Sequence, residues 1–158
     1  MDLYLIRHAE AEDRAEDQAD AERALTRKGE KQARRVADAL DSLDVRFDLL
    51  LTSPYRRALQ TSEALEDIAE RVEVEDRLAG PPDGGLVEKL RALGGPGAVI
   101  GVVGHEPHLG ELCSLLLLGN TDSARRFALA KSGLIALEWP DPACVKFALT
   151  PKLVKRLA

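Results

Sequence analysis

The sequence has few aromatic residues, few cysteines and no long apolar run. Aromatic residues make up 4 % of the 158 positions, so leucine, valine, isoleucine and alanine must build the core. The two cysteines, Cys113 in a leucine-rich run and Cys144 in a predicted strand, are interpreted as small buried residues, although their number allows one disulfide. The longest apolar run, around residues 115–118, is far too short to cross a bilayer, and the first residues do not resemble a signal peptide. We therefore expect a cytoplasmic protein with no membrane partner.

The sequence has many charged residues, but basic residues do not outnumber acidic ones. Charged residues make up 31 % of the chain, and 22 basic against 27 acidic residues give a net charge of −5. No basic stripe stands out, which argues against nucleic acid as the main partner. A local group of arginines could still bind an anionic substrate. The length suits one domain, so we expect a single domain over residues 1–158 without a separate lid domain, and a monomer by default.

Short apolar runs alternate with stretches of helical periodicity, which is typical of an α/β fold. We predict a three-layer αβα sandwich with a mostly parallel central sheet, helices on both faces and an antiparallel C-terminal strand. The acidic, alanine-rich residues 10–22 are predicted to form a solvated surface loop. The predicted strands are residues 3–6, 47–51, 72–74 and 99–103 and a final hairpin of 134–139 and 145–149; the predicted helices begin at Thr26, Ser53–Pro54, Leu86 and Pro107.

Three of the predicted strands end in reactive polar residues. Arg7 and His8 follow the first strand, residues 52–57 follow the second, and residues 104–108 follow the strand at 99–103. Ligands of open α/β sheets bind beyond the carboxyl ends of the strands, so two histidines and at least two arginines would share a pocket if these strands are parallel neighbours. A neutral imidazole is a competent nucleophile, arginine matches phosphate oxygens, and a second histidine can donate to them. The pattern favours phosphoryl transfer.

Each of these residues could also have a role outside phosphoryl transfer. A histidine beside an arginine at a strand end, such as His8, is often only structural, and Arg56 and Arg57 would normally be solvated on a first helical turn. The spacing of His105 and His108 also fits a metal site. Such a site would take its further ligand from Glu10, Glu12 or Glu106. Because the combination of motifs favours phosphoryl transfer, we expect neither a metal nor another cofactor.

Four blocks of sequence occur in a defined order along the chain. They read LIRHAEA at 5–11, LTRKGEKQA at 25–33, TSPYRRALQT at 52–61 and VGHEPHL at 103–109. Together they resemble the histidine phosphatase superfamily, the phosphoglycerate-mutase-like group, and within it the small phosphohistidine phosphatase branch of the SixA type. The resemblance implies that His8 is the nucleophile, that Arg7 and Arg57 clamp the phosphate, and that His105 is the fourth residue of the pocket.

The chain departs from the family pattern at several positions. Ala9 replaces the common glycine, as is usual in this branch, and Arg14 stands at an asparagine-like position, where we assign it no role. Where many relatives place an acidic proton donor, this chain reads Leu-Ala-Gly at residues 78–80. The usual general acid is therefore absent from the sequence. Four carboxylates could substitute for it: Glu10, Glu12, Asp83 and Glu106.

The missing acid suggests a substrate. An alkoxide leaving group needs protonation, whereas the imidazole of phosphohistidine can already carry a proton on its other ring nitrogen. We therefore expect hydrolysis of phosphohistidine, on a protein, through a phosphorylated His8. The alternatives are a broad-specificity phosphomonoesterase of the same fold acting on small phosphorylated molecules, and a phosphoprotein-binding module with slow turnover. A metal-dependent hydrolase is a further alternative.

Overall fold

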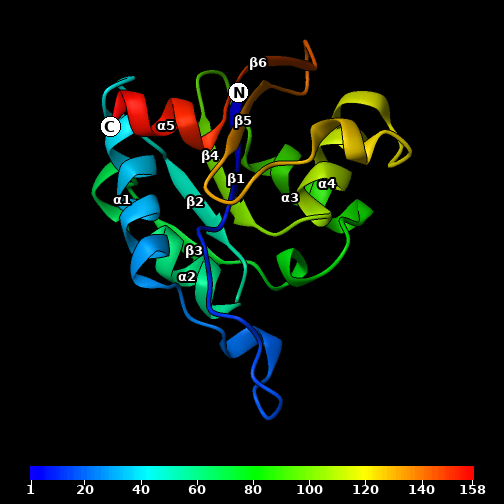
Figure 1. The fold of residues 1–158 in the computed structure, drawn as a ribbon. Helices are drawn as coiled ribbons and strands as arrows, with labels where there is room; N and C mark the ends of the chain where they lie inside the picture. The colour runs from blue at the N-terminus through cyan, green and yellow to red at the C-terminus, as the bar shows by residue number, and fades with distance from the viewer.

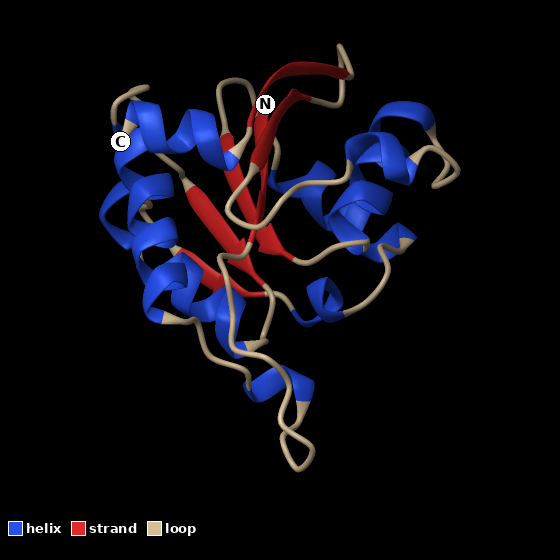
Figure 2. Cartoon of the chain, viewed as in Figure 1, coloured by secondary structure: helices blue, strands red, loops and turns tan.

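The computed structural model describes residues 1–158 and places a six-stranded sheet at the centre of the molecule (Figures 1 and 2). The strand order is β3-β2-β4-β1-β5-β6. β4 pairs in parallel with β1 and with β2, β2 pairs in parallel with β3, and β5 is antiparallel to both of its neighbours. The predicted mostly parallel sheet with an antiparallel C-terminal strand is confirmed. The strands are β1 (Asp2–Arg7), β2 (Leu49–Thr52), β3 (Val72–Val74), β4 (Val99–Gly104), β5 (Leu134–Glu138) and β6 (Cys144–Leu149).

Helices cover both faces of this sheet, which confirms the three-layer prediction. One core cluster joins Leu3, Leu5 and Val102 of the sheet to Leu90 and Leu112 on the helices of one face. A second cluster lies on the opposite face, beneath the other three helices. The helices of the first face are α3 (Gly84–Leu93) and α4 (His108–Leu118), and those of the second are α1 (Arg27–Asp41), α2 (Arg56–Glu63) and α5 (Pro151–Leu157). No helix combines the length and apolar composition needed to span a membrane.

Several local predictions were wrong for identifiable reasons. α2 begins at Arg56 rather than at Pro54: Tyr55 is at the N-cap position, and the Ser53 hydroxyl lies 2.7 Å from His105 Nε2 and accepts from the Tyr55 amide at 3.4 Å. The final helix α5 was not predicted, although Thr150 caps it and Pro151 opens it. Cys144 is exposed rather than buried, because it lies on the edge strand β6, whereas Cys113 is buried as predicted. Both thiols are free.

The start of α1 holds the chain that follows β1 in place. Thr26 caps the helix by accepting a hydrogen bond from the Gly29 amide at 3.0 Å, and its own amide donates to the Glu10 carbonyl oxygen at 3.0 Å. A Cβ atom on Gly29 would collide with that carbonyl oxygen. The glycine of the 25–33 block therefore lets the segment after His8 pack directly against the helix.

Candidate active site

The predicted pocket residues lie together at the carboxyl edge of the sheet. β1, β4 and β2 are parallel neighbours, so the turns that follow them open on the same edge. The centroids of the His8 and His105 rings are 5.0 Å apart. Arg57 Nε lies 3.3 Å from His8 Nε2. The structure thus brings residues from three distant parts of the chain into contact.

His8 is held so that one particular ring nitrogen is free. Its Nδ1 lies 2.7 Å from the Ala9 carbonyl oxygen, which can only accept, so Nδ1 must carry the proton. In the neutral ring Nε2 then holds a lone pair, to which Arg57 Nε donates. Burial lowers the pKa of His8 to about 4, with the charges of Arg57 and Arg7 acting in the same direction. Near pH 7 the ring is neutral, and the lone pair available to a substrate is on Nε2.

His105 is held by the opposite ring nitrogen. Its Nε2 lies 2.7 Å from the Ser53 hydroxyl, and its buried Nδ1 has no hydrogen-bond partner in the protein. Burial lowers the pKa of His105 to about 3, helped by the nearby His8 and Arg57. When the Ser53 hydroxyl donates to Nε2, Nδ1 carries the proton of the neutral ring. His105 is then a hydrogen-bond donor aimed by Ser53.

Two arginines supply the positive charge of the site. Arg57 is buried, and besides His8 it contacts Asp20 twice, through Nη2 to Oδ2 at 2.9 Å and through Nη1 to the main-chain oxygen at 2.7 Å. Arg7 donates from Nη1 to the Leu129 carbonyl oxygen at 2.7 Å, and its buried Nε has no partner. Guanidinium groups so placed can bind the oxygens of a phosphoryl group bidentately.

Three polar side chains of the sequence blocks brace these loops. The Thr61 hydroxyl accepts a hydrogen bond from the Ala9 amide and donates to the Arg57 carbonyl oxygen, which ties the turn after β1 to α2. Gln32 accepts from the Glu10 amide at 2.9 Å, and Gln60 accepts from the Leu25 amide at 2.7 Å. These residues therefore position the backbone around the site.

A cavity of about 180 Å³ opens at the site between the end of β4 and the 3-10 turn η1 (Asp20–Glu22). Its lining includes Asp20, Tyr55, Arg57, His105 and Ala79. The Tyr55 ring lies 4.9 Å from the His105 ring, and the Arg57 guanidinium lies 4.9 Å from the centroid of the same tyrosine ring. Tyr55 thus forms an aromatic wall of the cavity.

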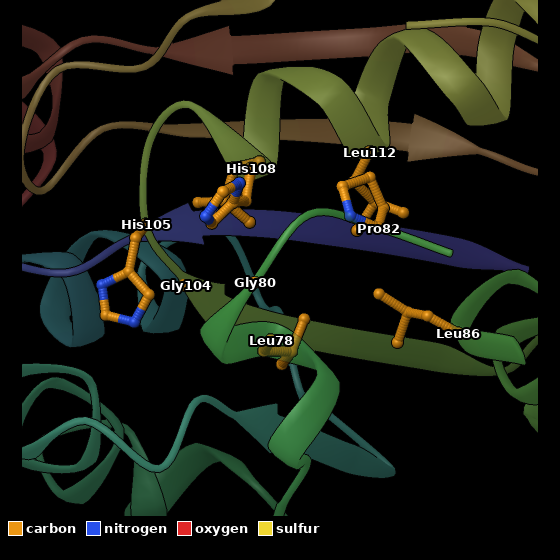
Figure 3. A pocket seen from close by; sticks show the side chains of 9 residues that line it. Leu78, Gly80, Pro82, Leu86, Gly104, His105, His108 and Leu112 are labelled. Atoms are coloured by element: carbon orange, nitrogen blue, oxygen red, sulfur yellow. The ribbon is translucent and has the colours of Figure 1, made fainter. Parts of the chain in front are cut away.

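A second and much smaller cavity, of about 10 Å³, lies beside the first (Figure 3). Figure 3 shows His105 and His108 beyond the end of β4, with the loop through Leu78, Gly80 and Pro82 running alongside. This loop is the one in which the sequence lacks an acidic residue. The structure therefore places the Leu-Ala-Gly segment of residues 78–80 against the site. Ala79, which lines the larger cavity, has no ionisable side chain that could act as an acid.

Comparison with known proteins identifies the family of the chain. The family model described as histidine phosphatase superfamily, branch 1, matches residues 3–80. The chain is 33 % identical over 156 residues to the phosphohistidine phosphatase SixA of Escherichia coli K12, covering 91 % of this chain and 95 % of that protein. The chain belongs to the histidine phosphatase superfamily. It is also 38 % identical over 143 residues to an uncharacterized protein of Picosynechococcus sp., covering 87 % of this chain and 84 % of that protein.

A solved structure of this branch has the same fold. The protein histidine phosphatase SixA complexed with tungstate superposes with a TM-score of 0.82 at 28 % identity, over 96 % of this chain and 98 % of that one. The resemblance of this superfamily member to the SixA branch therefore extends over nearly the whole chain.

The carboxylates proposed as substitutes for the missing acid are mostly engaged elsewhere. Asp83 caps α3 by accepting from the Leu86 amide, and Glu10 pairs with Lys28 and Thr26. Glu106 accepts from the Leu129 and Gly110 amides with its two oxygens. Glu12 is exposed on the acidic loop. Of the four, only Glu106 lines the cavity, and both of its oxygens are engaged by main-chain amides.

The alternative interpretations can also be placed in the structure. Arg56 is exposed as expected of a solvated arginine, whereas Arg57 is buried. His108 pairs through Nδ1 with Glu111 at 3.0 Å, and no three His, Cys, Asp or Glu side chains gather as a metal site would require. Arg14 is exposed, and its Nε contacts the Gln18 carbonyl oxygen of the same loop.

Sequence reasoning gave no role in the site to three residues that contact it: Ser53, Tyr55 and Asp20. Ser53 was assigned to a helix cap, and Tyr55 was the one aromatic residue of the 52–61 block, which could have drawn attention to it. Asp20 was interpreted as part of a solvated loop. No local pattern could have found Asp20, because its contact with Arg57 spans 37 positions.

Proposed function

We propose that this histidine phosphatase hydrolyses phosphohistidine through a covalent phosphoryl intermediate on His8 Nε2, without a metal ion. The observation that carries the proposal is the tethering of His8. Nδ1 donates to the Ala9 carbonyl oxygen, so the lone pair of a neutral ring stands on Nε2 beside the Arg57 guanidinium. This arrangement offers a nucleophile and a phosphate-binding group to the same phosphorus atom.

In the first step, the lone pair of His8 Nε2 attacks phosphorus and the bond from phosphorus to the substrate's nitrogen breaks. Charge on the phosphoryl oxygens is stabilised by donors from three strand ends: Arg7, Arg57 and His105 Nδ1. Two of these donor atoms, Arg7 Nε and His105 Nδ1, are buried without a protein partner. Buried donors normally have partners, so these two are suited to an oxyanion.

The substrate follows from the leaving group. A serine phosphate would leave as an alkoxide that needs an acid, but the loop at residues 78–80 contributes only Ala79 to the cavity. The imidazole of phosphohistidine leaves without such help when its other nitrogen is protonated. The likeness to the phosphohistidine phosphatase SixA of Escherichia coli supports the same choice. We therefore propose that the substrate is a phosphohistidine residue of another protein.

The test compares two peptides of one sequence that carry phosphohistidine or phosphoserine at the same position. We expect kcat/KM to favour phosphohistidine by about 100-fold or more, since general acid catalysis is commonly worth at least that factor. Both rates should survive a chelator. Preference for the phosphoserine peptide would overturn the assignment of substrate, and loss of activity with a chelator would overturn the metal-free mechanism. Unchanged activity of His8→Ala would overturn the covalent route.

A further inference from the structure

The acidic loop of residues 10–22 places one carboxylate, that of Asp20, in the site. Asp20 Oδ2 lies 2.9 Å from Arg57 Nη2, while Oδ1 lies 2.8 Å from Arg23 Nη2. The Arg57 side chain is 6 % exposed and the Asp20 side chain 40 % exposed, so the carboxylate reaches a buried guanidinium from the solvent side. Asp20 therefore occupies nitrogen atoms of Arg57 that a phosphoryl group would need.

Asp20 is distinguished from the other carboxylates of the region by this position. The cavity is lined by only two carboxylates, Asp20 and Glu106. Both Glu106 oxygens accept main-chain amides, which fixes that side chain in a structural role. Asp20 instead pairs only with arginine side chains, Arg23 and Arg57, and its side chain is 40 % exposed, so water can reach it.

We propose that Asp20 is the general base that activates water for hydrolysis of the phosphorylated His8. The proposal rests on the covalent intermediate argued above. In this step the Asp20 carboxylate takes a proton from water, and the water oxygen bonds to phosphorus. The bond from phosphorus to His8 Nε2 breaks, and its electron pair returns to the ring nitrogen. The products are orthophosphate and free His8, and the proton on Asp20 is then lost to solvent.

The charge state of Asp20 suits a base and not an acid. Burial alone would raise the pKa of Asp20, but its hydrogen bond to Arg57 and the charges of Arg57 and Arg23 outweigh burial and hold the pKa below its ordinary value. The group is thus anionic near pH 7, unable to protonate an alkoxide but able to accept a proton. When phosphoryl oxygens take over Arg57, Asp20 loses a cationic partner, and its proton affinity rises at the step that requires it.

His108 is another group in the cavity that could move a proton. It lines the same cavity as Asp20, but its Nδ1 is paired with Glu111. A test of Asp20 must therefore include His108. The direct comparison is between Asp20→Asn and His108→Gln.

The experiment follows a single turnover of a phosphohistidine peptide by rapid quench at neutral to alkaline pH. We expect Asp20→Asn to form phosphorylated His8 in a burst of one equivalent and then to hydrolyse it about 100-fold more slowly than the unmodified protein, the scale of general base catalysis. Asp20→Glu should restore part of the rate. Asp17→Asn, the same change at an exposed position of the same loop, should behave as the unmodified protein.

Each other outcome overturns the proposal in a distinct way. If Asp20→Asn turns over normally, or faster with tighter tungstate binding, Asp20 is a competing anion rather than a base. If Asp20→Asn loses the burst and tungstate binding while its thermal melting is unchanged, Asp20 only positions Arg57. If His108→Gln accumulates the phosphoenzyme and Asp20→Asn does not, His108 is the base. If the unmodified protein never phosphorylates His8, the covalent route fails, and this proposal fails with it.

Discussion

The turn after β1 and the turn after β4 each hold a buried histidine at the carboxyl edge of the sheet, but they hold it by different ring nitrogen atoms. His8 and His105 are 5 % and 6 % exposed, and burial lowers the pKa of both rings. At His8 a carbonyl oxygen tethers Nδ1, and at His105 a hydroxyl tethers Nε2. Because the two rings are almost equally buried, burial alone does not determine whether a histidine acts as a nucleophile or as a hydrogen-bond donor. In the proposed mechanism, the tethering group decides which ring nitrogen is left for the substrate, and so whether the histidine attacks or donates.

The largest effect that separates the two turns should come from His8→Ala. Removing the nucleophile should lower kcat/KM by about 10⁴-fold or more, because no intermediate can form. Steady-state kinetics with a phosphohistidine peptide, at equal folded content judged by circular dichroism, provide the measurement. Substantial activity of this variant would remove the functional difference between the two histidines.

His105→Ala should have a smaller effect of a different kind. Losing one donor to the transition state costs roughly 10²- to 10³-fold in kcat. His8 should still become phosphorylated, only more slowly, and mass spectrometry after a quench without acid would show the label. Absence of any label on His8, with the fold intact, would mean that the second histidine does more than donate.

Gly29→Ala probes the support of the β1 turn. The added Cβ would collide with the Glu10 carbonyl oxygen, so we expect a loss of roughly 1–3 kcal/mol in the free energy of unfolding. Urea denaturation measures it. Gly95→Ala is the matched control, because a Cβ there meets no atom within 4 Å. Equal stability of the two variants would show that the turn does not depend on this close approach.

The fold was largely predictable because its signals are local. The apolar run of β4 and the Thr26 cap of α1 can be recognised within a few residues. The proximity of His8 and His105 was also anticipated, since parallel neighbouring strands bring them to one edge of the sheet. The side-chain partners were not predictable. Ser53 and Asp20 reach His105 and Arg57 across 52 and 37 positions, and only tertiary packing sets such contacts.

Ser53→Ala tests the support of the β4 turn. Without the hydroxyl, His105 loses the partner that places its proton on Nδ1, and we expect kcat to fall about 10-fold, the worth of a hydrogen bond of about 1.4 kcal/mol. Ser62→Ala is the matched control, since the Ser62 hydroxyl is buried without a partner. A fall in KM alone, or equal effects of both variants, would argue against an orienting role for Ser53.

A pH dependence of stability also follows from the burial of His8. With a folded pKa of about 4, His8 stays neutral where the unfolded chain, titrating near 6.5, takes up a proton. The unfolded state then binds more protons, so this contribution to stability is complete above pH 6.5 and is lost as the pH falls toward 4. His8→Gln should therefore show a weaker loss of stability between pH 7 and pH 4.5 in urea titrations. An unchanged loss would contradict the low pKa.

The most direct test of the account is the position of the phosphoryl group on His8. Phosphorus NMR of the Asp20→Asn protein after reaction with a phosphohistidine peptide distinguishes the two ring nitrogens. The tether from Nδ1 to the Ala9 carbonyl oxygen predicts phosphorylation at Nε2 of His8. A phosphoryl group on Nδ1 of His8, or on His105, would contradict the account.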